Sequence, residues 1–261
     1  MNKDNNSLVS KINYPVTCLA TYSASVAKNI DGIVDVVLIG DSVGTTLYGM
    51  QNTQGVTLEM MKNHGLAVTK NIKKSITVID MPYKSYENKK DAFKNAKDLI
   101  KYTKANYIKI EIDKKKLKIL KYLSSKNINV IAHLGVTPQK FKNFKDIKIL
   151  GKSKAEEDGL IKLSSDAEKM GAKALLLECI TQQTSKKITS LVTIPTIGIG
   201  ASKYCDGQIL VFDDLINLSL QKIKPKFLKT YMNFNKVLTK AVKQYVKDVK
   251  QKKFPSSKYS Y

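Results

Sequence analysis

The sequence predicts a single (β/α)8 barrel, an α/β fold of the TIM-barrel type, formed by residues 1–261 and extended from about residue 218 by a basic helical segment. The chain has 261 residues, and one such barrel typically takes roughly 250. Its strand-like runs are almost continuously apolar, which is typical of parallel strands that are buried on both faces. Lysine-rich segments with apolar residues three and four positions apart separate these runs, as expected for helices. An open, doubly wound sheet is the structural alternative, but no GxGxxG motif follows the first strand to support it.

Short runs rich in β-branched residues mark the predicted strands. They cover residues 16–22, 34–41, 76–82, 107–113, 128–135, 174–180, 194–200 and 209–214. Segments between them, such as 86–104, 114–126 and 155–171, are predicted helices. Residues 218–252 are predicted to form one or two basic amphipathic helices that pack on the barrel or at a subunit interface. A role at a membrane surface is the alternative for this segment.

The net charge of +23 suggests a nucleic-acid partner, because lysines displace counterions from phosphates. All 45 basic residues are lysine, however, whereas base readout and bidentate phosphate binding depend heavily on arginine. The lysines are also spread along most of the chain. We therefore expect no specific nucleic-acid binding, and we interpret the charge as a bias in composition.

The composition favours a cytoplasmic protein without a membrane anchor. No apolar run approaches the roughly 20 residues that span a bilayer, and the opening MNKDNNSLVS has no apolar core typical of a secretion signal. The three cysteines are far apart and form no CxxC pair, so we expect neither a disulfide framework nor a zinc site.

Polar residues lie at the ends of five successive predicted strands, namely Asp41, Asp80, Glu111, His133 and Glu178. A single aspartate at a strand end is usually a helix cap or a turn residue. In a barrel, however, the C-terminal strand ends meet at one mouth, where active sites are built. The five residues together therefore predict one polar pocket.

The fourth predicted strand places charge inside the barrel. Side chains alternate along a strand, so Tyr107, Lys109 and Glu111 share one face while Ile108 and Ile110 point toward the helices. Unpaired buried charges are costly. The pair is then either a satisfied internal ion pair, or a functional pair in which Lys109 holds a substrate carboxylate and Glu111 supports a cation.

Asp41, Asp80 and Glu111 form a set of oxygen ligands without cysteine, which suits Mg²⁺. Zinc would require more histidine or cysteine than His133 alone supplies. His64 lies in a helical segment, where we expect a packing or surface residue.

The strand ends also carry a series of distinctive motifs. In order, these are Ile39-Gly40-Asp41-Ser42-Val43-Gly44, Ile79-Asp80-Met81-Pro82-Tyr83, Ile108-Lys109-Ile110-Glu111, His133-Leu134-Gly135-Val136-Thr137-Pro138-Gln139, Leu177-Glu178-Cys179, Ile194-Pro195-Thr196-Ile197-Gly198-Ile199-Gly200-Ala201 and Cys205-Asp206-Gly207-Gln208-Ile209-Leu210-Val211. From about residue 12 to residue 250, their order and spacing resemble the ketopantoate hydroxymethyltransferase (3-methyl-2-oxobutanoate hydroxymethyltransferase) family. The resemblance implies a barrel of the phosphoenolpyruvate/pyruvate superfamily type.

The resemblance also implies a reaction. A hydroxymethyl group passes from the co-substrate 5,10-methylenetetrahydrofolate to 3-methyl-2-oxobutanoate, and the product is 2-dehydropantoate for pantothenate biosynthesis. Mg²⁺ on the keto and carboxylate oxygens would acidify the C3–H bond and stabilise the enolate that forms. The family further implies a homo-oligomer, either an octamer or a decamer.

Particular residues take roles through the same resemblance. It implies that Asp41 and Asp80 bind Mg²⁺, with Glu111 bound to the metal directly or through water. Asp41, Ser42, Asp80 and Lys109 would contact the keto acid, and Glu178 would be the general base. Ser42 and His133 could orient the keto acid or the water around the metal.

Two segments depart from the family pattern. The family usually has Tyr-Asp where this chain has Tyr22-Ser23, and residues 144–149 carry lysine in place of the glycines of a loop. These changes concern folate handling and loop closure more than the core chemistry.

Two alternative functions fit parts of the sequence. One is a different Mg²⁺-dependent carbon–carbon bond enzyme for 2-oxo acids in the same superfamily, but the Cys-Gly-His motif of isocitrate-lyase-type members is absent. The other is a non-catalytic basic binding protein, which the presence of Asp41, Asp80 and Glu178 disfavours.

Overall fold

Eight parallel strands form a closed barrel in the computed structural model, which describes residue 8 and residues 15–143, 147–220 and 225–261. The strands are β1 (Val16–Ala20), β2 (Val36–Ile39), β3 (Ile76–Asp80), β4 (Tyr107–Glu111), β5 (Val130–Gly135), β6 (Ala174–Glu178), β7 (Thr196–Ile199) and β8 (Gly207–Val211). Each strand pairs with its neighbours in chain order, and β8 returns to pair with β1. The predicted (β/α)8 barrel is confirmed.

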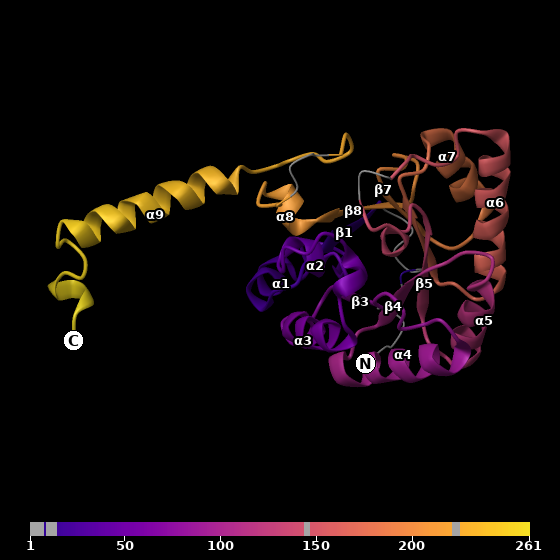
Figure 1. Cartoon of the computed structure of the whole chain (residues 1–261), viewed down its shortest axis with the longest axis horizontal. Helices are drawn as coiled ribbons and strands as arrows, with labels where there is room; N and C mark the ends of the chain where they lie inside the picture. Colours follow the sequence, from indigo (N-terminus) through magenta and orange to yellow (C-terminus); the bar gives the residue numbers. More distant parts are fainter. Residues whose placement is uncertain (1–7, 9–14, 144–146, 221–224) are drawn as a thin grey trace. The chain divides into compact units, whose positions relative to one another are not determined.

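Helices surround the strands (Figure 1). They are α1 (Ala24–Ile30), α2 (Val43–Thr46), α3 (Leu58–Thr69), α4 (Lys89–Thr103), α5 (Leu117–Ser125), α6 (Lys154–Lys169) and α7 (Gln182–Leu191), with short 3-10 turns η3 (Thr53–Gly55) and η4 (Pro138–Lys140). Residues 200–206 join β7 to β8 through turns. Asp206 stabilises this connection, because its Oδ2 accepts hydrogen bonds from both the backbone N and the Oγ1 of Thr196.

Short polar side chains start most of these helices. The residue before the first turn accepts a hydrogen bond from a backbone N–H of that turn at Ser23, Thr57, Asn88, Ser153 and Thr181. Ser153 and Glu156 complete a capping box at the start of α6. Each such cap typically contributes about 1 kcal/mol of helix stability. The residue at the start of each of these helices therefore helps to fix where the helix begins.

Alternation along the strands divides the core into two layers. Val37, Ile79, Ile108 and Ile110 face outward and pack against the helices. The inward-facing layer fills the barrel with Val16, Cys18, Val36, Leu38, Ile76, Val78, Tyr107, Ile131, Leu176, Ile197 and Ile209, among others. The cavity left among the inward-facing side chains is about 10 Å³, at most the space of one water molecule. The barrel is therefore a packed core and not a channel.

The strand bounds are narrower than the predicted ones, because apolar residues continue past the last ladder hydrogen bonds into the loops. The prediction of strand 209–214 is wrong at its end. The strand stops at Val211, and Phe212–Leu215 form the short helix α8. Asp213 and Asp214 lie in the first turn of this helix, where negative charge is favoured by the helix dipole.

The chain divides into two compact units, Met1–Val211 and Phe212–Tyr261. Besides α8, the second unit contains α9 (Phe234–Lys250) and the short turn η6 (Ser257–Tyr259). Of the predicted helical stretch 218–252, the described residues form one helix, α9, while residues 221–224 lie outside the description. Residues 144–146 of the glycine-poor loop lie outside it as well.

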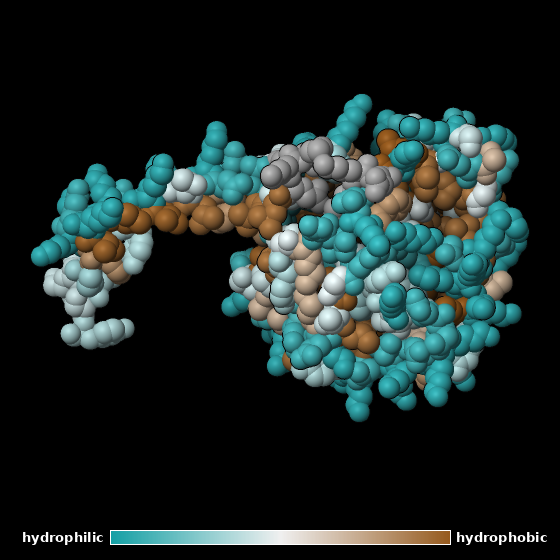
Figure 2. All heavy atoms as spheres, in the orientation of Figure 1, coloured by the Kyte–Doolittle hydropathy of each residue, from teal (hydrophilic) through white to brown (hydrophobic). Residues whose placement is uncertain are grey.

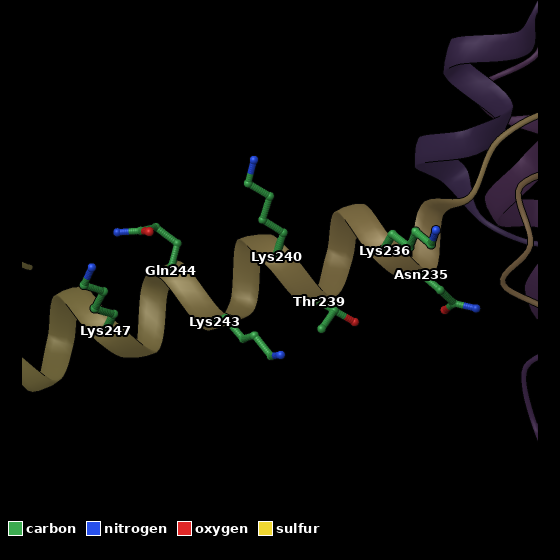
Figure 3. Close-up of a pocket in the computed structure, with 7 residues that line it drawn as sticks. All are labelled: Asn235, Lys236, Thr239, Lys240, Lys243, Gln244 and Lys247. Carbon is green, nitrogen blue, oxygen red and sulfur yellow. The ribbon is translucent and has the colours of Figure 1, made fainter.

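Helix α9 is amphipathic. Figure 2 shows hydrophobic side chains along one side of it. By their three- and four-residue spacing, the exposed Leu238, Val242, Tyr245 and Val249 share one face of the helix. The lysines labelled in Figure 3, among them Lys236, Lys240 and Lys243, follow at three- and four-residue spacing and so share another face of the helix. The hollow along the polar side is lined, among described residues, by α9 alone, and one helix cannot enclose a ligand. No helix in the described part of the chain is long and apolar enough to cross a membrane.

Gly65 tests the packing between α3 and the barrel. A Cβ at this position would lie 2.6 Å from Cγ2 of Thr103 and 2.7 Å from Cδ1 of Ile79. Gly65→Ala should therefore lower the free energy of unfolding by about 1–3 kcal/mol, the usual cost of overpacking.

Gly159 on α6 is the control, since no atom lies within 4 Å of its added Cβ. Gly159→Ala should raise stability by about 0.5–1 kcal/mol through helix propensity. Urea denaturation measures both, and equal effects of the two variants would contradict the packing argument.

Candidate active site

The C-terminal end of the barrel interior is charged. Asp80, Glu111 and Glu178 are the last residues of β3, β4 and β6, and His133 lies within β5. The strand register pairs Asp80 with Lys109 and Glu111 with His133, so these side chains lie side by side facing the barrel axis. The structure thus brings the polar strand ends together, directly above the apolar barrel interior.

Lys109 is at the centre of this charged layer. Its Nζ lies 3.1 Å from Oδ1 of Asp80, an ion-pair distance, and 3.3 Å from Nδ1 of His133. On the far side of the ring, Nε2 of His133 lies 3.1 Å from Oε2 of Glu178. A chain of polar contacts therefore crosses the barrel from β3 to β6.

The protonation states along this chain follow from burial and charge. Burial alone would lower the pKa of Lys109, but Asp80, Asp41 and Glu111 together raise it above its ordinary value. Burial and the charge of Lys109 lower the pKa of His133 well below its usual range. Lys109 therefore donates to Nδ1 of a neutral ring, and the remaining ring proton is on Nε2, on the side of Glu178.

Asp41 and Glu111 are joined through Gln139. The backbone N of Asp41 donates to Oδ2 of Asp80 at 3.0 Å. Gln139 Nε2 donates to Oδ2 of Asp41 at 2.7 Å, and the Gln139 backbone N donates to Oε1 of Glu111 at 3.0 Å. One buried residue thus holds one oxygen of each carboxylate.

Two carboxylate oxygens of the layer lack a hydrogen bond within the described residues, Oδ1 of Asp80 and Oε2 of Glu111. Lys109 lies within ion-pair distance of the first, but not in hydrogen-bond geometry. Burial raises the pKa of Asp80 to about 7, against the charge of Lys109. Burial and the charge of Asp41 raise the pKa of Glu111 to about 8. Burial also raises the pKa of Asp41. The site therefore holds more carboxyl groups than its one lysine can neutralise, and some of them keep a proton near neutral pH.

Among the described residues, no three His, Cys, Asp or Glu side chains gather closely enough to hold a metal by themselves. Mg²⁺ does not need such a cage, because it is usually held by one or two carboxylates together with water and substrate oxygens. Oδ1 of Asp80, which has Lys109 beside it but no hydrogen bond, and Oε2 of Glu111 fit a cation of this kind, whereas the donor set offers no sulfur for a softer metal.

Glu178 lies at the more open edge of the layer. Its side chain keeps 18% of its surface exposed, against 3% for that of Asp80. Desolvation by the surrounding atoms still raises the pKa of Glu178 to about 7. The backbone of Glu178 is fixed from β5, since its O accepts from Val136 N at 2.9 Å. This approach requires glycine at Gly135, where a Cβ would lie 2.2 Å from that same oxygen.

Ser42 is linked to the end of β1. Its Oγ lies 2.5 Å from the hydroxyl of Tyr22, and the backbone O of Tyr22 lies 2.8 Å from Nδ1 of His64. His64 is half-buried on α3 and hydrogen-bonds to Tyr48 as well. Ser23, where the family resemblance led us to expect aspartate, accepts from Val26 N and starts α1. Serine and aspartate are comparable helix caps, so this departure leaves the local structure intact.

Tyr22, Tyr86 and Gln139 contact the site but are not among the predicted site residues. Gln139 belongs to the motif at 133–139, which was its only signal. Tyr86 is buried in the loop after β3, and its hydroxyl donates to Oε1 of Gln139 at 2.5 Å. The sequence offers no pattern that would have identified Tyr86.

The sequence profile that describes ketopantoate hydroxymethyltransferase matches residues 6–257. The chain belongs to this family. The 3-methyl-2-oxobutanoate hydroxymethyltransferase of Pelagibacter ubique (strain HTCC1062) is 44% identical to it over 262 residues, which cover 100% of both chains. The enzyme of the same name from Rhizobium rhizogenes (strain K84 / ATCC BAA-868) is 38% identical and covers 95% of this chain and 90% of its own.

Membership in the ketopantoate hydroxymethyltransferase family confirms the family predicted from the strand-end motifs, and with it the predicted class of enzyme, a hydroxymethyltransferase. The match over nearly the whole chain also agrees with the extent of the resemblance.

Solved structures show the fold shared by this family member. A structure of phosphonopyruvate hydrolase aligns with a TM-score of 0.63 at 12% identity, covering 99% of this chain and 93% of the other. A structure of 2,3-dimethylmalate lyase, a PEP mutase/isocitrate lyase superfamily member, aligns with a TM-score of 0.59 at 10% identity, covering 98% and 89%. These likenesses confirm the fold, a (β/α)8 barrel.

The raised carboxylate pKa values make stability depend on pH. Between about pH 6.5 and pH 8, the folded protein without divalent cations holds protons on Asp80, Glu111 and Glu178 that the unfolded chain has lost, so stability falls as pH rises. His133 does not oppose this trend, because its lowered pKa costs stability only below the ordinary histidine range. Urea denaturation in a chelating buffer measures the slope, and Glu111→Gln should make it shallower. Stability that rises with pH across this window would contradict the assignment.

Proposed function

We propose that this chain transfers a hydroxymethyl group from 5,10-methylenetetrahydrofolate to 3-methyl-2-oxobutanoate, giving 2-dehydropantoate, with Mg²⁺ as the metal. The observation that supports it best is the layer itself. Glu178, with a pKa of about 7, is separated from buried Lys109 by His133, and two carboxylate oxygens of the layer lack hydrogen bonds. The names of the relatives support the same keto acid. By resemblance to the family, we also propose that the chain works as a homo-oligomer, an octamer or decamer.

Asp41 and Asp80 would hold Mg²⁺, with Glu111 bound to it directly or through water. Asp80 Oδ1 and Glu111 Oε2 are the buried oxygens that lack a hydrogen bond. When bound, Mg²⁺ acts as a Lewis acid on the keto group and makes the neighbouring C–H bond more acidic. The metal would also offset the negative charge that raises the pKa of Glu111.

Lys109 would bind the carboxylate of the keto acid. Its ammonium has three N–H donors, of which one faces Asp80 and one His133. One donor is left for a substrate oxygen. Ser42, whose Oγ is fixed against Tyr22, would orient the keto acid from the β2 side. His133 is neutral and would add an N–H without adding charge.

Glu178 would be the general base. A base is most effective when its pKa lies near the working pH, and burial brings Glu178 to about 7. It would take the C3 proton of the keto acid, and the resulting enolate would attack the one-carbon unit. A C3–C bond forms, both bonds from the one-carbon unit to the folate nitrogens break, and water supplies the hydroxyl oxygen. The C3 proton and one proton of that water end on the two folate nitrogens.

The metal assignment predicts the effect of two amide variants. Asp41→Asn and Asp80→Asn keep the side-chain shape but remove charge, so each should weaken Mg²⁺ binding and nearly abolish activity while the fold remains. Calorimetric titration with Mg²⁺ and a product assay measure these effects. Asp113→Asn is the control. Asp113 likewise lies near the C-terminal end of a barrel strand, β4, but it pairs with Lys140. Unchanged Mg²⁺ affinity in both site variants would remove the metal assignment.

The base assignment predicts a partial reaction. With Mg²⁺ and no folate, the wild-type enzyme should exchange the C3 hydrogen of the keto acid for deuterium in heavy water, followed by NMR. Glu178→Gln should still bind Mg²⁺ and the keto acid, but its exchange should fall by about 10²–10⁴-fold, the usual contribution of a positioned base. Exchange at the wild-type rate in Glu178→Gln would rule out Glu178 and make His133 the first candidate.

A further inference from the structure

Gln139 is a buried polar residue at the edge of the carboxylate layer that the reaction described above does not use. It lies in η4, after β5, and is 2% exposed. A buried amide without partners would be costly. The contacts that satisfy it lead to three other segments of the barrel: the ends of β2 and β4, and the loop after β3.

The hydrogen-bond partners of the Gln139 side chain fix the orientation of its amide. The hydroxyl of Tyr86 accepts from the backbone N of Glu111 at 3.2 Å, and its proton goes to Oε1 of Gln139. Nε2 of Gln139 then uses its two protons on Oδ2 of Asp41, at 2.7 Å, and on the backbone O of Met81, at 3.0 Å. A flipped amide would place oxygen against the Asp41 carboxylate and against a carbonyl. Asp41, Met81 and Tyr86 therefore favour the same orientation of the amide, and Tyr86 is the group that fixes its oxygen end.

The surroundings hold Tyr86 itself in place. Its ring is 1% exposed, and Nζ of Lys116 lies 4.3 Å from the ring centroid, within the range of a cation–π contact. The side chain of Gln54 donates to the backbone O of Gln139 at 2.9 Å, which anchors η4 from η3. Both ends of the Gln139 contact network are thus fixed to the barrel.

From this geometry, we propose that Gln139, oriented by Tyr86, is a positioning residue that holds Asp41 and Glu111 so that each keeps one oxygen free for the cation. The inference rests on the proposed function, since it concerns the same metal. Gln139 takes Oδ2 of Asp41 and Oε1 of Glu111, and Oε2 of Glu111 has no hydrogen-bond partner within the described residues. Gln139 does this without adding charge to a site that already has an excess of carboxylates. Groups of this kind, which orient ligands from outside, typically change metal affinity by about 10–100-fold when removed.

The test is calorimetric titration of Mg²⁺ into the protein with 3-methyl-2-oxobutanoate and without folate. Gln139→Met keeps the length and volume of the side chain but removes the donors, so Mg²⁺ affinity should fall by about 10–100-fold. Tyr86→Phe keeps Gln139 and removes only the orienting hydroxyl, so it should weaken Mg²⁺ binding by a smaller factor. In assays of product formation, high Mg²⁺ should restore much of kcat in both variants.

Ser85→Ala is the matched control, because buried Ser85 bonds to Pro82 O in the same loop as Tyr86 without touching a carboxylate. It should lower thermal stability but leave Mg²⁺ affinity unchanged. If wild-type protein binds Mg²⁺ while Gln139→Met and Tyr86→Phe bind it equally well, the positioning role is wrong and the proposed function stands. If one variant does not fold, the other decides. If wild-type protein binds no Mg²⁺, the metal assignment and the inference both fail.

Discussion

The interaction on which this site depends is the buried ion pair between Lys109 and the carboxylates around it. Lys109 is the only buried lysine in the described part of the chain, and Asp80, Asp41 and Glu111 keep it charged. Removing one member of such a buried group leaves an uncompensated charge, which is far costlier than losing an exposed pair. The pair is also incomplete, because one lysine faces more carboxylates than it neutralises. A stable fold is thereby left with a site that favours a further cation and an anionic substrate.

The barrel makes this arrangement possible. The rest of its interior is filled with apolar side chains. The charged layer therefore packs against a core that excludes water. Charges interact more strongly in such surroundings than in water. The strand register then decides which charges meet, since it pairs Asp80 with Lys109 and Glu111 with His133. The packing that stabilises the fold is therefore the same packing that perturbs the pKa values in the site.

Lys109 also separates two sides of the site with different chemistry. On the β2–β4 side, Asp41, Asp80 and Glu111 offer oxygens suited to a metal, and Gln139 holds two of them. On the β5–β6 side, neutral His133 stands between Lys109 and Glu178. A keto acid bound to Lys109 would have its carbonyl toward the first side and its acidic C–H toward the second. Members of the ketopantoate hydroxymethyltransferase family need both functions on one substrate, and this layer places them on opposite sides of one ammonium.

The sequence by itself determined the strand order, the closed barrel and the polar strand ends, because apolar periodicity and alternation are local properties. It placed Lys109 and Glu111 on the inner face of β4 by the same rule, and its motifs identified the family. It did not reveal the contact of Tyr86 with Gln139, or the stop of β8 at Val211 before α8. Tyr86 and Gln139 are 53 positions apart, and no periodicity relates them. Only the tertiary structure decided which polar groups hydrogen-bond to one another. These groups meet only when the barrel closes and its loops fold over the strand ends.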